Sequence, residues 1–347
     1  MRRFDRRQLF DMLTYARPAY SATERAFIDR YIRVLPGAYI DGGHNWHVRV
    51  GDSPILWSCH TDTVHRLHGY QTLHLDGSTI RLSKRSRKRG FDCLGADDTA
   101  GVALCVQMIR AGVAGHYIFH SAEEIGGIGS TWIAKETPDL LQRFTYAIAL
   151  DRRGTSDVIT HQYGRCCSDA FAHSLADVLS TGDTLAYEPD DSGIFTDTAN
   201  YTDLIGECTN LSVGYDNAHT SREYLDVDHV ERLFHALCAL SPDSLVSSRQ
   251  PRDDDPDWHT YSWHDWRDYD DLTLPQICAS HDLPEFVECR YCGTCYDYET
   301  SDARSFMDYC SRDCEDNCEH RSSVYLDPEH EHVQAALRRQ TGLRLVH

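Results

Sequence analysis

The chain has 347 residues, of which 41% are hydrophobic and 25% are charged, and its formal net charge is −20. No apolar run reaches the roughly 18 residues that a membrane-spanning helix needs, so we expect no membrane partner. Because binding to phosphates requires a basic surface, the strong negative charge also disfavours nucleic acid as a partner.

The N-terminus and the cysteine content indicate a cellular compartment. The first residues are charged and no long apolar segment follows them, which is not typical of a secretory signal, so we expect a cytoplasmic protein. In that reducing compartment the 14 cysteines are expected to bind metal or to remain buried thiols rather than to form disulfides.

The negative charge is concentrated in one part of the chain. Residues 251–320 contain 19 acidic residues and 5 arginines, which gives a net charge of −14. Such a change in composition is typical of a domain boundary. We therefore predict a large domain over residues 1–245, an acidic linker with tryptophans over 246–283, a cysteine-rich module over 284–320 and a helical tail over 321–347.

Helix-like and strand-like segments alternate through the first part of the chain. Apolar residues at helical spacing predict helices over residues 22–33, 99–111, 130–136, 168–180 and 227–240. Short apolar runs predict strands over residues 46–50, 54–59, 117–120, 146–150 and 207–213. The alternation predicts an α/β fold, with a mixed, mostly parallel sheet sandwiched by helices and ligands at the carboxyl ends of the strands.

Residues suited to metal binding follow several predicted strands or open a predicted helix. They are His60 and Asp62, the pair Asp97-Asp98, the pair Glu123-Glu124, Asp151 and His219. Taken singly, each has an ordinary explanation, such as a surface hydrogen bond, a helix N-cap or a turn. Taken together, buried carboxylates repel one another at a cost of several kcal/mol unless cations accompany them. Histidine and carboxylate ligands suit a borderline divalent ion such as zinc, so the pattern favours a metal site.

The order of these residues resembles that of the co-catalytic di-zinc exopeptidases, which include the zinc aminopeptidases, peptidase T and the acetylornithine deacetylase-like amidohydrolases. The shared pattern is His-x-Asp, Gly-x-Asp-Asp, Glu-Glu-x-Gly-x-x-Gly, Asp and His, over about residues 20–240. The resemblance implies the zinc exopeptidase fold and a hydrolase that cleaves amide bonds with two Zn²⁺, Co²⁺ or Mn²⁺ ions. It implies further that Asp97 bridges two metals, with His60 and Asp151 completing one site and Glu124 and His219 the other.

The resemblance also assigns roles to residues that would not bind the metals. Glu123 would be the general base, and the carboxylate of Asp62 would orient His60. The peptide bond between Asp97 and Asp98 would be cis, which is rare where proline is not involved.

The spacing departs from two branches of this family. Only 67 residues separate Asp151 from His219, too few for the lid domain that the amidohydrolase branch carries there. Only 36 residues separate the first two predicted ligands, which leaves no room for the domain that another branch inserts. We therefore expect a catalytic domain without a lid, in which Asp197 either receives a substrate α-amino group or caps a helix. The basic run over residues 84–89 is expected at an exposed hairpin tip.

The C-terminal region contains a second candidate metal site. Its pattern, Cys-x2-Cys-Gly followed by Tyr-Cys-Ser-x2-Cys, resembles small treble-clef or FCS-type zinc fingers. Four thiolates would form a closed structural Zn²⁺ site and supply folding energy to a segment too short to build a core. The predicted ligands are Cys289, Cys292, Cys310 and Cys314, with Cys295 and Cys318 as alternatives, and scattered free thiols are the other interpretation. A protein partner is considered for this module.

Three functions remain open from the sequence. The favoured one is an aminopeptidase that removes N-terminal residues from peptides. The second is a deacylase or carboxypeptidase-like amidohydrolase that acts on N-acyl amino acids, and the missing lid weakens this interpretation. The third is a non-catalytic binding protein with the same fold, which the complete set of ligands and base weakens.

Overall fold

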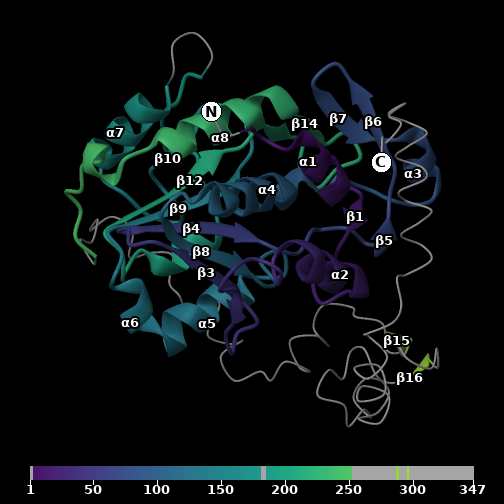
Figure 1. The fold of residues 1–347 in the computed structure, drawn as a ribbon, viewed down its shortest axis with the longest axis horizontal. Helices are drawn as coiled ribbons and strands as arrows, with labels where there is room; N and C mark the ends of the chain where they lie inside the picture. Colours follow the sequence, from purple (N-terminus) through teal and green to yellow (C-terminus); the bar gives the residue numbers. More distant parts are fainter. Residues whose placement is uncertain (1–2, 181–184, 252–286, 289–294, 297–347) are drawn as a thin grey trace. The chain divides into compact units, whose positions relative to one another are not determined.

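The computed structural model describes residues 3–180 and 185–251, and the two short strands at 287–288 and 295–296 (Figure 1). The first two ranges contain an eight-stranded sheet with the order β11-β10-β12-β9-β4-β8-β3-β2. Its strands are β2 (Tyr39–Ile40), β3 (Trp46–Val50), β4 (Ile55–His60), β8 (Gly115–His120), β9 (Tyr146–Arg152), β10 (Asp157–Ile159), β11 (Glu188–Asp190) and β12 (Glu207–Ser212).

The central strands of this sheet are parallel. Strand β12 pairs in parallel with β9, β9 with β4, and β4 with β8. The antiparallel pairings lie outside them, between β8 and β3, β3 and β2, and β10 and β12. Every residue of β4, β8 and β12 is buried, because helices and loops cover both faces, and this explains the apolar runs Ile55–Trp57 in β4 and Tyr117–Phe119 in β8. The mixed, mostly parallel sheet predicted from the sequence is therefore confirmed.

Helices cover the sheet, and several of them begin at a capping side chain. They are α1 (Arg6–Met12), α2 (Ala22–Tyr31), α4 (Ala96–Ala111), α5 (Ile128–Glu136), α6 (Pro138–Leu141), α7 (Asp169–Leu179) and α8 (Val227–Ala239). The side chains of Ser21, Ser168 and Asp226 accept hydrogen bonds from backbone N–H groups in the first turns of α2, α7 and α8. In Figure 1, α4 lies across the central strands beside α8.

A four-stranded sheet with the order β13-β14-β7-β6 lies beside the main one. Its strands are β6 (Leu73–Asp76), β7 (Thr79–Leu82), β13 (Tyr215–Asp216) and β14 (Tyr224–Asp226), and a separate pair joins β1 (Tyr15–Ala16) to β5 (Gly69–Tyr70). The basic run does not lie at a hairpin tip, which corrects the prediction. It forms helix α3 (Lys84–Lys88) after β7, because the Ser83 side chain caps the N–H of Ser86.

Among the described residues, every helix is too short or too polar to cross a membrane. The two C-terminal strands, β15 (Val287–Glu288) and β16 (Cys295–Tyr296), pair antiparallel with each other. The predicted zinc ligands Cys289, Cys292, Cys310 and Cys314, and the alternative Cys318, lie outside the described residues.

Residues that follow the predicted boundary at 245 make contacts with the large domain. The carboxylate of Glu207, which is fully buried at the start of β12, accepts hydrogen bonds from the backbone N–H groups of Ser248 and Arg249 at 2.7 and 2.9 Å. The Arg249 guanidinium in turn donates to the carbonyl oxygens of Thr202 and Gly206 at 3.1 and 2.9 Å. Residues 248 and 249 are therefore part of the packed domain.

We predict that a chain truncated after Ser247 is less stable than one truncated after Pro251. The shorter chain leaves the buried Glu207 carboxylate without two of its donors, and an unsatisfied buried group costs about 1–3 kcal/mol. Urea unfolding of both proteins, monitored by circular dichroism, measures the difference. Equal midpoints would mean that these contacts contribute nothing to stability.

Candidate metal centre

The predicted metal ligands gather at the carboxyl edge of the central parallel strands. His60 is the last residue of β4, and Asp151 lies near the end of β9. Glu124 lies in the turn that follows β8, and Asp97 lies at the start of α4. His219 lies in the connection between β13 and β14. Parallel strands end at the same edge of a sheet, which is why residues far apart in the sequence meet here.

The five side chains form two groups that share Asp97. In the first group, His60 Nε2 lies 3.1 Å from Asp97 Oδ1 and 3.5 Å from Asp151 Oδ1. In the second group, His219 Nε2 lies 3.3 Å from Asp97 Oδ2 and 3.2 Å from Glu124 Oε2. Within each group the potential ligand atoms all lie within 4.8 Å of one another. Asp97 thus presents a different oxygen to each group.

Glu123 lies beside the first group without belonging to either. Its Oε2 atom is 4.0 Å from His60 Nε2, and its side chain is largely buried. Asp62 holds this part of the site together. Its carboxylate accepts hydrogen bonds from the backbone N–H groups of Glu123 and Glu124, both at 3.1 Å, and lies 3.3 Å from His60 Nδ1. His60 Nδ1 also lies 3.1 Å from the backbone carbonyl oxygen of Asp62, so this one fully buried residue positions both the imidazole and the turn that carries the two glutamates.

The backbone is unusual around the site. The peptide bond between Asp97 and Asp98 is cis, as the resemblance implied. Ala122, Asn217 and His219 have φ values of 56°, 56° and 62°, in the left-handed region that residues other than glycine seldom adopt. Ala122 directly precedes the glutamate pair, and His219 is itself a predicted ligand. Such conformations are kept where the surrounding structure fixes them, and they occur often at functional sites.

Burial and mutual repulsion disfavour ionisation of the acidic residues in the site. Burial, together with the charge of Asp97, raises the pKa of Asp151 to about 6 and that of Glu124 to about 7. Burial also raises the pKa of Glu123 well above its ordinary value, and the charge of Asp151 adds to this rise. These carboxylates therefore lack positive charge that would stabilise their ionised forms.

The two histidines supply part of that positive charge. Hydrogen bonds to Asp97 and Glu124 raise the pKa of His219 to about 11. Burial opposes protonation of His60, but the charge of Asp151 raises its pKa well above the ordinary value. Burial also opposes ionisation of Asp97, but hydrogen bonds to His219 and His60 lower its pKa.

The arrangement fits two divalent cations better than two protonated imidazoles. Glu124 Oε1 is buried and has no hydrogen-bond partner among the residues that the structure describes. An unsatisfied buried carboxylate oxygen is costly, and a metal ion would remove the cost. Histidine nitrogens and carboxylate oxygens are the donor set that zinc prefers outside cysteine-rich sites. The residues present therefore fit a pair of metal ions that share Asp97.

Two supporting residues were not predicted from the sequence. Arg17 is fully buried, and its guanidinium donates to the carbonyl of Thr61 at 2.6 Å and to the hydroxyl of Thr99 at 2.7 Å. Arg17 thus links the residue after strand β4 to the first turn of helix α4. Asn210 on β12 accepts from the backbone N–H of Asp151 at 2.9 Å and donates to its carbonyl at 3.0 Å. Nothing in the local sequence around either residue signals these long-range contacts.

Asp197 lies close to the site but is almost fully buried, with 1% of its surface exposed. Its Oδ2 atom is 3.3 Å from His120 Nδ1, whose pKa burial lowers to about 3, so that histidine carries no charge at neutral pH. Burial raises the pKa of Asp197 to about 8. Asp197 opens the short 3-10 helix η1 (Asp197–Tyr201), for which Thr196 occupies the cap position and makes no side-chain capping bond.

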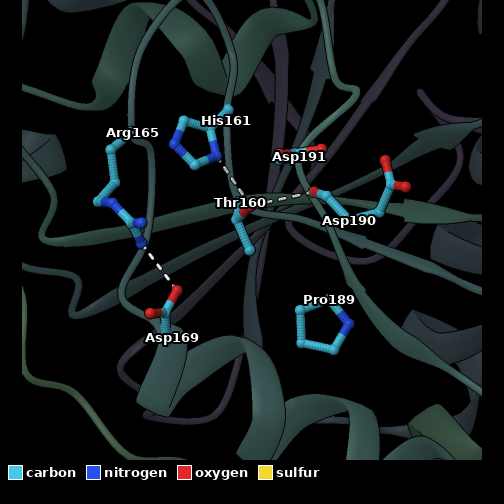
Figure 2. Close-up of a pocket in the computed structure, with 7 residues that line it drawn as sticks. All are labelled: Thr160, His161, Arg165, Asp169, Pro189, Asp190 and Asp191. Atoms are coloured by element: carbon cyan, nitrogen blue, oxygen red, sulfur yellow. Dashed lines mark hydrogen bonds and ion pairs between the residues drawn. The ribbon is translucent and has the colours of Figure 1, made fainter.

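Figure 2 shows a separate polar hollow next to strands β10 and β11. The Arg165 guanidinium donates to the Asp169 carboxylate at 2.8 Å across its rim. None of the residues that line it belongs to the metal groups or contacts them; they are Thr160, His161, Arg165, Asp169, Pro189, Asp190 and Asp191. We therefore place the candidate chemistry at the two metal groups and not in this hollow.

We predict that the metal-free protein becomes less stable as the pH rises from about 6 to about 8. The pKa of Glu124 is about 7 in the folded protein and 4.5 ordinarily, so ionisation between these values favours the unfolded chain. The pKa of His219 is 6.5 ordinarily and about 11 in the folded protein, so above pH 6.5 the unfolded chain releases this proton while the folded protein keeps it, which also favours the unfolded chain. Added Zn²⁺ should therefore raise the melting temperature more at the higher pH. A metal-free melting temperature that increased over this range would contradict the assignment.

The sequence matches no protein-family model and no curated protein. Solved structures do resemble the fold. Aminopeptidase PepT from Bacillus cereus is 12% identical, with a TM-score of 0.54 over 67% of this chain and 96% of that one. A tripeptidase from Staphylococcus aureus is 13% identical, with a TM-score of 0.53 over 67% and 95%. An aminopeptidase from the archaeon Desulfurococcus kamchatkensis is 12% identical, with a TM-score of 0.50 over 69% and 97%. At these identities the likeness establishes the fold: residues of this chain adopt the fold seen in these aminopeptidases.

Proposed function

We propose that this chain is a metal-dependent exopeptidase, and specifically an aminopeptidase that removes unblocked N-terminal residues from peptides. The observation that carries the proposal is the pair of ligand groups that share Asp97, with Glu123 beside them and outside both. A carboxylate shared by two ligand groups, with a free carboxylate beside them, suits two-metal hydrolysis, in which the ions activate a water molecule and a base accepts its proton. The fold common to this chain and solved aminopeptidases supports the same conclusion.

The residues of the two groups would hold the metals. His60 and Asp151 belong to the first group, Glu124 and His219 to the second, and Asp97 to both. Bound zinc, or cobalt or manganese in its place, would polarise the scissile carbonyl and lower the pKa of a water molecule. The chain itself must provide the remaining requirements, which are a proton acceptor, a fixed ligand geometry and recognition of the substrate.

Glu123 is suited to move the proton. It lies within reach of the first group and is not needed as a ligand, so one of its oxygens is free to accept a proton from the attacking water. The same oxygen would then deliver the proton to the leaving amine. Burial raises the pKa of Glu123 well above its ordinary value, which helps the side chain to retain the proton between the two transfers. The hydrogen bond from its backbone N–H to Asp62 fixes its position.

The surplus of carboxylates favours a positively charged substrate end. Asp62, Asp197 and Glu123 are not assigned to a metal. Burial raises the pKa of Asp197 to about 8 and that of Glu123 well above its ordinary value, so these two would add negative charge around the site only once bound cations favour their ionised forms. Because Asp62 and Asp197 are buried, their proposed contribution is attraction at a distance and not contact with the amine. A substrate with a free α-amino group would be attracted, whereas the carboxylate of an N-acyl amino acid would be repelled.

In the C-terminal region we propose a third, structural Zn²⁺ held by Cys289, Cys292, Cys310 and Cys314. Four thiolates at these spacings are typical of a closed tetrahedral site. The proposal rests on the sequence pattern alone, and it implies three metals in the whole chain, of which the large domain holds two.

The first prediction concerns the base. Glu123→Gln should lower the turnover rate by about 10²–10⁴-fold, because an amide cannot accept the proton, while the metal content of the active site stays unchanged. Glu124→Gln is the matched control, since the neighbouring residue is a proposed ligand and its amide should lose metal. Elemental analysis beside a peptide hydrolysis assay measures both properties. Metal loss in Glu123→Gln with the metal retained in Glu124→Gln would mean that the two roles are exchanged.

The second prediction concerns the substrate. A peptide with a free N-terminus should be hydrolysed much faster than the same peptide acetylated at that amine, because acetylation removes the positive charge that the carboxylates attract. A third peptide, with a free amine and an amidated C-terminus, should be hydrolysed about as fast as the first. Release of the N-terminal residue is followed by chromatography. Faster hydrolysis of the acetylated peptide would favour the deacylase, and no hydrolysis of any peptide by the metal-loaded protein would favour a binding protein.

A further inference from the structure

Glu223 makes a dense set of hydrogen bonds to the loop that precedes α4. Its Oε2 atom accepts from the backbone N–H groups of Leu94 at 2.8 Å and Gly95 at 3.0 Å. Its Oε1 atom accepts from those of Ala96 at 2.7 Å and Asp97 at 3.2 Å. The side chain is 1% exposed, so water does not compete for these bonds.

The loop needs such a partner because it lies before the residue that caps the regular part of α4. The backbone is non-helical at Asp97 and Asp98, and Asp98 Oδ1 accepts from the N–H of Gly101 at 2.9 Å. Gly95 precedes that cap with φ 69° and has no side chain, so it offers no oxygen to the N–H groups of the loop. A carboxylate at the N-terminal end of a helix is favourable for its charge as well as for its hydrogen bonds. Glu223, which is 126 residues further along the chain than Asp97, supplies that carboxylate.

Glu223 also belongs to the segment that carries His219. Both residues lie in the connection between β13 and β14, and the backbone N–H of Glu223 donates to the carbonyl of Thr220 at 3.0 Å. His219 Nε2 in turn lies 3.3 Å from Asp97 Oδ2. One short connection therefore supplies a side chain of the second group and the anchor for the backbone of the residue that the two groups share.

We propose that Glu223 is a positioning residue of the metal centre, which fixes the Asp97 backbone relative to His219 so that both ligand groups form together. The proposal rests on the metal centre described under the proposed function. Without Glu223, the N–H groups of the loop would turn toward other acceptors, and Asp97 would no longer be fixed at the point where the groups meet. The affinity for metal should then fall at both positions, since both use Asp97.

Glu223→Gln tests this role with almost no change in shape. One of the two oxygens becomes an NH₂ group, which cannot accept from the N–H groups that face it. We expect the affinity for Zn²⁺ and Co²⁺ to fall by about 10–100-fold, the range found for residues that orient metal ligands. Affinity is measured by competition with a chromophoric chelator, and the visible absorption of bound Co²⁺ reports separately on coordination geometry, independently of any hydrolytic activity.

The chain provides a matched control in Glu207. This glutamate is also fully buried, and its carboxylate also accepts four hydrogen bonds, from Ser168 N, Ser168 Oγ, Ser248 N and Arg249 N. It lies at the start of β12, away from the ligand edge. Glu207→Gln should destabilise the metal-free protein as Glu223→Gln does, but it should leave the metal affinity and the Co²⁺ spectrum within about twofold of the wild type.

The outcomes separate this proposal from the proposed function. If the wild type binds no metal through its histidines and carboxylates, the metal centre itself is wrong. If the wild type binds two ions and Glu223→Gln binds them with unchanged affinity and spectrum, or if Glu207→Gln weakens binding equally, Glu223 has only a structural role. Should Glu223→Gln fail to fold without metal, Glu223→Asp is used instead. Glu223→Asp keeps the negative charge but has a shorter side chain. We expect it to bind metal more weakly than the wild type and to show a Co²⁺ spectrum that differs only in part from that of the wild type.

Discussion

Carboxylates crowded at one edge of a buried sheet are the constraint on which the rest of the structure depends. The structure compensates them in two different ways. Asp98 accepts from the backbone N–H groups of His60 and Gly101, and Asp62 and Glu223 likewise accept from backbone N–H groups. The proposed ligands Asp97 and Glu124 face mainly imidazoles and one another. Asp62, Asp98 and Glu223, which support the site, are thus held by hydrogen bonds from the backbone, whereas Asp97 and Glu124 are left for cations.

Much of this arrangement could be predicted from the sequence because strand ends are visible there. The apolar runs that end near His60, Glu123 and Asp151 are buried strands, and the structure has strands β4, β8 and β9 at those places. Since parallel strands end at one edge, the residues after them had to meet, whatever the lengths of the loops. The cis peptide at Asp97 was expected only through the resemblance to known peptidases, and the structure contains it.

The supporting contacts could not be predicted because they depend on tertiary packing. Glu223, Arg17 and Asn210 act on residues far away in the sequence, and a single Glu, Arg or Asn has no periodicity that marks such a partner. The prediction of a hairpin tip for the basic run over residues 84–89 was wrong for a local reason. Its charge suggested an exposed tip, but Ser83 caps the residues that follow it and a helix begins there. The hydrogen bond from Arg249 to Glu207 could not be predicted either, because the proline and acidic residues nearby resemble a linker.

The two groups differ in how open they are to solvent. His60 is 1% exposed, whereas the His219 side chain is 49% exposed and belongs to a surface connection. All the proposed ligands of the first group are largely buried, whereas the second group combines the largely buried Asp97 and Glu124 with one exposed imidazole, whose movement would open that position to solvent. The two positions would therefore exchange their ions at different rates even if they bound them equally tightly, and a chelator would empty the centre in two steps, beginning at His219.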